Sequence, residues 1–294
     1  MSDSRTKRLI LTCAAGLSVL LVVIIAGKSA FGKRMDKETE SCPVPVNLNE
    51  TLTNEMSDTS CLAGFDKIVK DYLTYWGIHG ASLSVMRNDS LLFAKGYGEA
   101  DTDKKMGPGN ILRMASVSKL VTAVGIMVLQ ERGLLSIKDH VFGPDGILND
   151  SAYVAAIKDT LYNRITVEDL LRHKGGFSKR GGDPMFSTRW IMMQNGWKEV
   201  PTQEQLMELQ LKRRVRFVPG TAQEYSNFGY LALSMVIEKV SGMDYETFMQ
   251  ENVLRPIGCV DFHIAGNYYK HKLPNETRYY VQHDDEPAEE FNNS

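Results

Sequence analysis

The chain has 294 residues, which is enough for one large domain or two small ones. Its residues are 43% apolar and 24% charged, a composition that excludes a disordered, collagen-like or disulfide-stapled chain. The net charge of −2 argues against a nucleic acid partner, because phosphate binding needs clustered lysine and arginine. We therefore expect a folded, nearly neutral globular protein.

A membrane anchor is predicted near the N-terminus. Residues 1–8 form a short basic tail, and residues 9–27 are 19 consecutive residues without a charged side chain. A helix of that length spans roughly 28 Å, close to the ~30 Å hydrocarbon core of a bilayer. A cleaved signal peptide is the alternative, but its apolar region is normally shorter and ends in a small-x-small site. We expect a retained signal-anchor and a single-pass membrane protein.

The compartment is indicated only by weak signals. Basic residues lie on both sides of residues 9–27, so the positive-inside rule leaves the orientation open. Four glycosylation sequons favour a glycoprotein whose globular part is lumenal or extracellular. They begin at Asn49, Asn88, Asn149 and Asn275. A mitochondrial anchor is the alternative, because early basic residues followed by an apolar run also suit that membrane.

Cysteine usage gives two readings. Cys42 and Cys61 flank a polar stretch and can close a disulfide in an oxidising compartment, but four unrelated thiols are an equally good interpretation. Cys13 lies in the apolar run, and Cys259 is left over. Neither a CxxC nor an HExxH motif occurs, so we predict no metal site and no cofactor.

The globular pattern begins after a polar stalk over residues 28–60. Apolar residues spaced by three and four predict a helix over 62–76, ended by Gly77. Two strands, 81–86 and 91–97, follow as a hairpin. Further helices are predicted at 117–132, 167–172, 203–212, 230–240 and 244–254, with a glycine-rich loop at 175–182 and an acidic tail at 267–294. The fold class is therefore α+β, a hairpin followed by a helical subdomain.

The first candidate for chemistry is a Ser-x-x-Lys motif. Ser116 and Lys119 lie one helical turn apart on the same face. The start of a helix favours developing negative charge, and a lysine among apolar neighbours can serve as a base. The spacing alone is weak, because Ser4 and Lys7 repeat it in the basic tail.

The second candidate is Tyr225-Ser-Asn227, which lies between a Pro-Gly turn and a predicted buried helix. A tyrosine hydroxyl beside a lysine can share the duty of a base, and an asparagine can hydrogen-bond an amide of a substrate. The alternative is a tyrosine that faces the core and an asparagine that caps the helix.

These two elements and their surroundings resemble a known family. The segments RMASVSKLVTA (113–123), ITVEDLLRHKGGF (165–177) and FVPGTAQEYSNFGY (217–230) occur in the family's order. The chain thus resembles the serine β-lactamase-related family, which includes class C β-lactamases, penicillin-binding proteins, family VIII-type esterases and animal β-lactamase-like proteins. The resemblance covers roughly residues 62–260 and implies a β-lactamase/transpeptidase-like fold.

The resemblance also implies roles for four residues. Ser116 would be the acylated nucleophile, with its backbone N–H as the first oxyanion donor, and Lys119 its proton acceptor. Tyr225 would be the partner base and leaving-group acid, and Asn227 a contact to the substrate. His173, tempting as a base, is expected to be structural.

The sequence departs from the family pattern at its end. The third motif, Lys-Thr-Gly or His-x-Gly, is not found, and residues 263–266 (HIAG) do not replace it. That motif supplies a second oxyanion donor, whose loss costs about 2.7–4 kcal/mol. We therefore expect a domain over 61–266 that lacks its C-terminal third and has an incomplete sheet. A truncated gene model, a short splice form and a diverged protein all fit this pattern. The charged loop 179–183 borders the substrate entrance or is simply solvated.

The function expected from these residues is that of a membrane-anchored serine hydrolase. It would form an acyl-enzyme with a small-molecule or peptide substrate that carries an ester, amide or peptide bond. The alternative is a catalytically inactive binding or scaffold protein on the same fold, because the third motif is absent. The sequence gives no indication of the oligomeric state.

Overall fold

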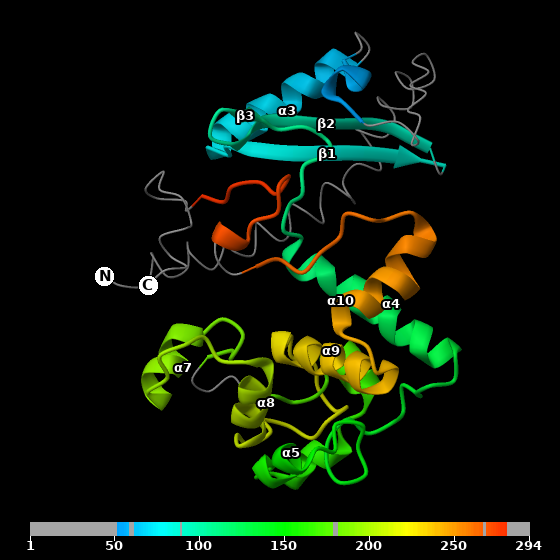
Figure 1. The fold of residues 1–294 in the computed structure, drawn as a ribbon, viewed down its shortest axis with the longest axis vertical. Helices are drawn as coiled ribbons and strands as arrows, with labels where there is room; N and C mark the ends of the chain where they lie inside the picture. The colour runs from blue at the N-terminus through cyan, green and yellow to red at the C-terminus, as the bar shows by residue number, and fades with distance from the viewer. Residues whose placement is uncertain (1–51, 59–61, 89, 179–181, 267–268, 281–294) are drawn as a thin grey trace. The chain divides into compact units, whose positions relative to one another are not determined.

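The computed structural model describes residues 52–58, 62–88, 90–178, 182–266 and 269–280. They form two compact units. The sheet unit contains the described residues up to Leu112 and from Gly266 onward, and the helical unit is Arg113–Ala265 (Figure 1). The predicted domain over 61–266 is thus divided between two units.

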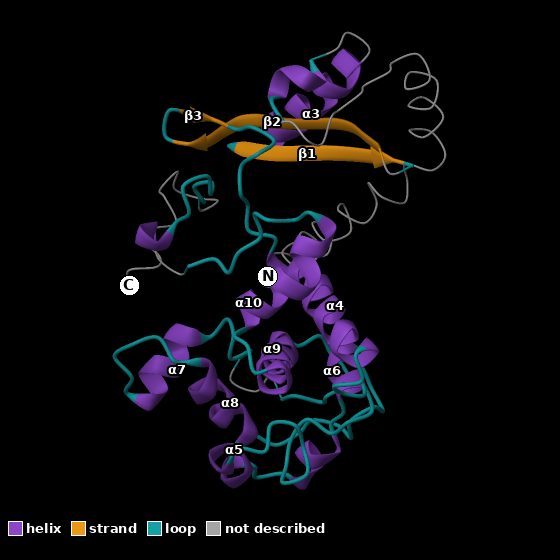
Figure 2. Ribbon diagram, turned by 45° about the vertical axis from the view of Figure 1, so that its right-hand side comes forward, coloured by secondary structure: helices purple, strands orange, loops and turns teal. Residues whose placement is uncertain are grey.

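The sheet unit is built on the predicted helix and hairpin, both of which are confirmed. Helix α3 (Ala63–Trp76) ends at Gly77, whose φ of 62° is left-handed and suits glycine. Strands β1 (Gly80–Arg87), β2 (Ser90–Asp101) and β3 (Lys104–Lys105) form an antiparallel sheet in the order β1-β2-β3. Helix α3 lies along one face of this sheet, where Phe65 packs edge-on against Phe93 (Figure 2).

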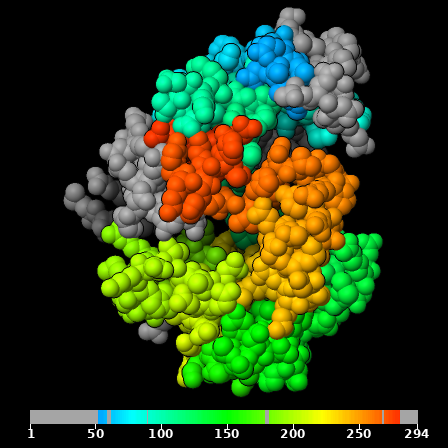
Figure 3. Space-filling model, viewed as in Figure 1, coloured from blue at the N-terminus to red at the C-terminus, as the bar shows by residue number. Residues whose placement is uncertain are grey.

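Residues 269–280 complete the sheet unit. The backbone N–H of Ile111 donates to the carbonyl of Asn275 at 2.8 Å, and that of Thr277 donates back to Ile111 at 2.9 Å. The N–H of Arg278 donates to the carbonyl of Ala100 on β2 at 2.7 Å. Figure 3 shows this segment in red beside the teal atoms of the strands. Part of the region expected to be an acidic tail therefore belongs to the fold.

A buried lysine joins α3 to β2. Lys95 is only 7% exposed and forms ion pairs with Asp58 and, at 2.6 Å, with Asp66. The hydroxyl of Tyr97 donates to Asp66 at 2.7 Å. Burial raises the pKa of the Asp66 carboxyl, but the hydrogen bonds from Lys95 and Tyr97 and the lysine's charge outweigh it, so the pKa lies below its ordinary value.

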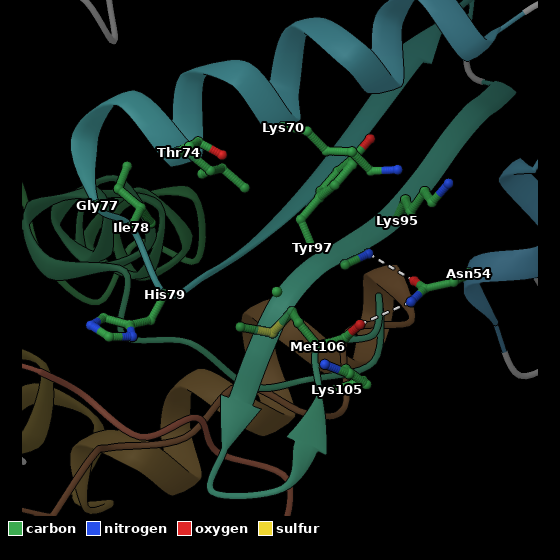
Figure 4. Close-up of a pocket in the computed structure, with 13 residues that line it drawn as sticks. Asn54, Lys70, Thr74, Gly77, Ile78, His79, Lys95, Tyr97, Lys105 and Met106 are labelled. Atoms are coloured by element: carbon green, nitrogen blue, oxygen red, sulfur yellow. Dashed lines mark hydrogen bonds between the residues drawn. The ribbon is translucent and has the colours of Figure 1, made fainter.

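An open pocket of about 590 Å³ lies between the end of α3 and β2 (Figure 4). Asn54 spans one side of it: its Nδ2 donates to the carbonyl of Met106 at 2.9 Å, and its Oδ1 accepts from the N–H of Gly96 at 2.8 Å. The pocket lining contains none of the four predicted catalytic and substrate-binding residues.

The helical unit contains the remaining described helices. They are α4 (Ser118–Glu131), α5 (Ser151–Ala156), α6 (Val167–Leu171), α7 (Thr188–Asn195), α8 (Gln203–Leu211), α9 (Asn227–Ser241) and α10 (Tyr245–Met249). Figure 2 shows α9 almost end-on, with α4, α6 and α10 around it. Helix α9 lies at the centre of the core and is apolar on more than one side. Its residues Leu233, Val236 and Ile237 have no exposed surface.

Three details differ from the predicted helices. Helices α5 and α7 were not predicted. Helix α9 begins at Asn227 rather than at Tyr230, because the Ser226 hydroxyl caps it by accepting from the N–H of Gly229 at 3.1 Å. The single helix predicted over 244–254 is α10 followed by a wider π-helical turn, Gln250–Leu254.

Among the described residues, none of the helices combines the length and apolarity needed to cross a bilayer. The predicted anchor over 9–27, together with Asn49, Cys42 and Cys61, lies outside the described residues.

Candidate active site

Ser116 lies in a 3₁₀ turn, Ala115–Val117, that leads directly into α4. The residue before it, Ala115, has a φ of 45°, in the left-handed region that residues with a Cβ rarely adopt. Such a conformation costs about 1–2 kcal/mol and persists only where the surrounding structure imposes it. The serine is therefore held on a strained turn at the start of a helix.

Two side chains contact the serine oxygen. The hydroxyl of Tyr225 donates to Ser116 Oγ at 2.6 Å, and Lys119 Nζ donates to the same oxygen at 3.3 Å. The lysine nitrogen also lies 4.9 Å from the ring centre of Tyr225 and 5.6 Å from that of Tyr230. The two candidate proton-transfer groups thus meet at one oxygen, with the cation over two aromatic rings.

Asn227, the first residue of α9, connects the lysine to a further acidic residue. Its Oδ1 accepts from Lys119 Nζ at 2.8 Å, and its Nδ2 donates to Asp183 Oδ2 at 2.9 Å. The structure therefore brings together all four residues singled out in the sequence. It adds Asp183, which the sequence placed only in a charged loop and for which no local signal indicates this contact.

His173 packs against the tyrosine of the site. Its backbone has a left-handed φ of 56°, and its Nδ1 accepts from the N–H of Ser226 at 3.2 Å. Its ring centre lies 4.5 Å from that of Tyr225 and 5.2 Å from that of Tyr230. Burial, with a smaller effect from Tyr225, raises the pKa of Tyr230.

The remaining candidates lie elsewhere. His263 Nδ1 is 3.0 Å from Glu246 Oε1, and the N–H of Ile264 bonds the other oxygen of the same carboxylate at 3.2 Å. His263 and Ile264 thus both contact Glu246. Within the part of the chain that the structure describes, no cluster of three or more His, Cys, Asp or Glu side chains could hold a metal ion.

Comparison with known proteins identifies the family. The Beta-lactamase family profile matches residues 65–292. Penicillin-binding protein 4* of Bacillus subtilis (strain 168) is 26% identical over 165 residues, which are 55% of this chain and 32% of the relative. A putative D-alanyl-D-alanine carboxypeptidase of Escherichia coli O157:H7 is 23% identical over 234 residues, which are 75% of this chain and 49% of the relative. The chain thus spans half or less of the length of these curated relatives.

Solved structures show the same fold. EstCE1, a hydrolase with promiscuous acyltransferase activity, is 24% identical with a TM-score of 0.58, over 77% of this chain and 58% of its own. The octameric penicillin-binding protein homologue from Pyrococcus abyssi is 24% identical with a TM-score of 0.56, over 75% of this chain and 48% of its own. The fold is therefore β-lactamase/transpeptidase-like, as predicted. With a family profile that spans most of its length and this fold, the chain belongs to the beta-lactamase family.

Proposed function

We propose that the chain is a serine hydrolase that acts through an acyl-enzyme on Ser116. The observation that carries this proposal is the position of Ser116 Oγ, 2.6 Å from the Tyr225 hydroxyl and 3.3 Å from Lys119 Nζ. A serine oxygen becomes nucleophilic when an adjacent group takes its proton. The Tyr225–Lys119 pair can take the proton of Ser116 once one of the two side chains is deprotonated.

The reaction would proceed in two halves. Ser116 Oγ attacks the carbonyl carbon of the substrate, and its proton passes to the Tyr225–Lys119 pair. The carbonyl oxygen becomes an oxyanion, for which the backbone N–H of Ser116 is the first donor. The tetrahedral intermediate then collapses, and the leaving group departs with a proton from Tyr225. Water repeats the same steps on the acyl-serine, releasing the acid and restoring the Ser116 hydroxyl.

The substrate class is an ester, amide or peptide. Asn227 Nδ2 uses one hydrogen for Asp183, and its second hydrogen can donate to a carbonyl beside the reacting bond. The names of the relatives support acyl transfer, because they include a carboxypeptidase, a penicillin-binding protein and a hydrolase with acyltransferase activity.

We also propose that residues 9–27 anchor the protein, with the globular part lumenal or extracellular and a mitochondrial location as the alternative. Three sequon asparagines, Asn88, Asn149 and Asn275, are exposed and support glycosylation. Removal of N-glycans should increase the protein's mobility on a gel, and alkaline carbonate should leave it in the membrane pellet. An unshifted band and a mitochondrial fraction would favour the alternative.

Labelling of the serine tests the hydrolase directly. The full chain, purified in mild detergent and shown to be folded by circular dichroism, is treated with a fluorophosphonate or a reactive penicillin. We expect one adduct by intact mass, lost in Ser116→Ala and retained in the control Ser118→Ala, two residues along the chain. A folded protein that takes neither reagent would instead support a binding or scaffold protein on this fold.

A further inference from the structure

We infer that Asp183 is a positioning residue that fixes the side-chain amide of Asn227 and thereby places Lys119 beside Ser116. The inference rests on the proposed function, because it assigns Asp183 a role in the same acylation step. Asp183 itself thus has a part in the site.

Asp183 is itself held by the turn that precedes α7. Its backbone carbonyl accepts from the N–H groups of Phe186 at 3.0 Å and Ser187 at 2.9 Å. Its Oδ1 accepts from the N–H of Met185 at 3.0 Å. The other oxygen, Oδ2, then faces Asn227 and accepts from its Nδ2 at 2.9 Å and its backbone N–H at 3.4 Å. The carboxylate therefore has a fixed direction before it meets the amide.

The chemistry of the two groups determines the orientation of the amide. An amide presents an acceptor on one side and a donor on the other, whereas an ionised carboxylate only accepts. Nδ2 must therefore face Asp183, and Oδ1 is left to accept from Lys119 Nζ at 2.8 Å. The reversed amide would set an oxygen against the carboxylate and N–H groups against the lysine, which is repulsive at both contacts.

A carboxylate is required here rather than an amide of the same shape. The two oxygens of Asp183 serve two different donors, Met185 N–H and the Asn227 amide. An asparagine at this position has one acceptor oxygen and cannot serve both. The backbone bonds of Phe186 and Ser187 do not depend on the side chain, so Asp183→Asn changes the contact while leaving the turn.

A double-mutant cycle tests the inference on the full chain in detergent. Fluorophosphonate inactivation is measured for the wild type, Asp183→Asn, Asn227→Ala and the double variant. For each protein, the dependence of the rate on reagent concentration gives a dissociation constant and the maximal inactivation rate, kinact. We expect Asp183→Asn to lower kinact about ten-fold or more with the dissociation constant unchanged, because a displaced catalytic group reacts slowly. In the Asn227→Ala background the same change should alter kinact less than about two-fold. The exposed Asp145→Asn is the control and should match the wild type.

Each alternative outcome has a distinct meaning. An equal fall in kinact with and without Asn227 would show that Asp183 acts on its own loop and would overturn the inference. Wild-type kinact in Asp183→Asn would overturn it while leaving Ser116 as the nucleophile. A folded wild type that takes no label removes both proposals. Thermal midpoints of the same four proteins give a second cycle that needs no activity, and strictly additive losses would overturn the contact itself.

Discussion

At the scale of single residues, the contacts of His173 are those of a residue that supports the site. Its Nδ1 accepts from the N–H of Ser226, which is buried, and its ring packs on Tyr225, whose hydroxyl contacts Ser116. The imidazole therefore fixes the backbone and the ring of the Tyr225-Ser-Asn227 motif. The backbone of His173 is left-handed, so this position also needs a residue that tolerates a positive φ.

Two substitutions of His173 separate support from base catalysis. His173→Asn keeps a side-chain acceptor and tolerates the φ of 56°, so we expect stability to be retained and fluorophosphonate labelling to fall less than about ten-fold. His173→Ala leaves the Ser226 N–H without its acceptor and should cost about 1–3 kcal/mol. A His173→Asn protein that is folded but no longer labelled would instead make the imidazole an essential base.

At the scale of elements, α4 has two apolar faces with different surroundings. Ile126 and Leu129 are fully buried in the helical core. On another side of the same helix, Leu120, Val124 and Met127 are 69%, 48% and 44% exposed. The apolar character of α4 therefore exceeds what its packing within the helical unit explains.

A matched pair of substitutions on α4 tests this difference. Ile126→Ala removes fully buried methyl groups and should destabilise the protein by about 2–5 kcal/mol. Leu120→Lys changes an exposed side chain and should shift the free energy of unfolding by no more than about 0.5 kcal/mol. Urea unfolding followed by circular dichroism measures both. A large loss for Leu120→Lys would mean that this face is covered in the folded protein.

Local patterns predicted the long elements well; among the short ones they located α6, which Thr166 caps, but missed α5 and α7. Gly77 and Gly133 end α3 and the α4 region where the sequence places them, and the spacing of apolar residues identifies both helices. Helices α5 and α7 have only six and eight residues, too few for a clear period, and their packing holds them in place.

In the candidate site, too, local patterns predicted some contacts and missed others. The Ser-x-x-Lys spacing is local, and the resemblance to a family connected Ser116 to Tyr225 across the chain. The Asp183–Asn227 contact joins residues 44 positions apart, and no local pattern encodes it. The bridge between Ile111 and Glu276 was missed for the same reason.

At the scale of the whole molecule, the buried ion pairs of the sheet unit make its stability depend on pH. The pKa of Asp66 is lower in the folded chain than in the unfolded one, where it is about 3.9. The ionised carboxylate therefore stabilises the fold fully above about pH 4, and this contribution is lost as the pH falls through the folded pKa. Acid should unfold the protein in part through this group.

Removal of one partner at pH 7 gives the sharper measurement. Lys95→Met removes the closer cation from the largely buried Asp66 and leaves only the exposed Lys70, 4.0 Å away, so we expect a loss of about 3 kcal/mol. The double variant Lys95→Met/Asp66→Asn should recover part of it, because the poorly compensated carboxylate charge is gone. Asp66→Asn alone should flatten the dependence of the thermal midpoint on pH between 3 and about 5. Equal slopes for the wild type and Asp66→Asn would contradict this account.

In the sequence, the helical unit lies between the two segments of the sheet unit, which affects the order in which the units can fold during synthesis on the ribosome. Residues up to Leu112 leave the ribosome first, whereas residues 269–280 of the same unit follow only after the helical unit. The helical unit is continuous and can fold while the rest is still being made. Once it has folded, the bridge from Ile111 to Glu276, which lie 165 positions apart, no longer closes a fully flexible loop. A folded unit in place of flexible chain lowers the entropic cost of closing that loop. The order of translation therefore favours docking of residues 269–280 onto the sheet unit after the helical unit has folded.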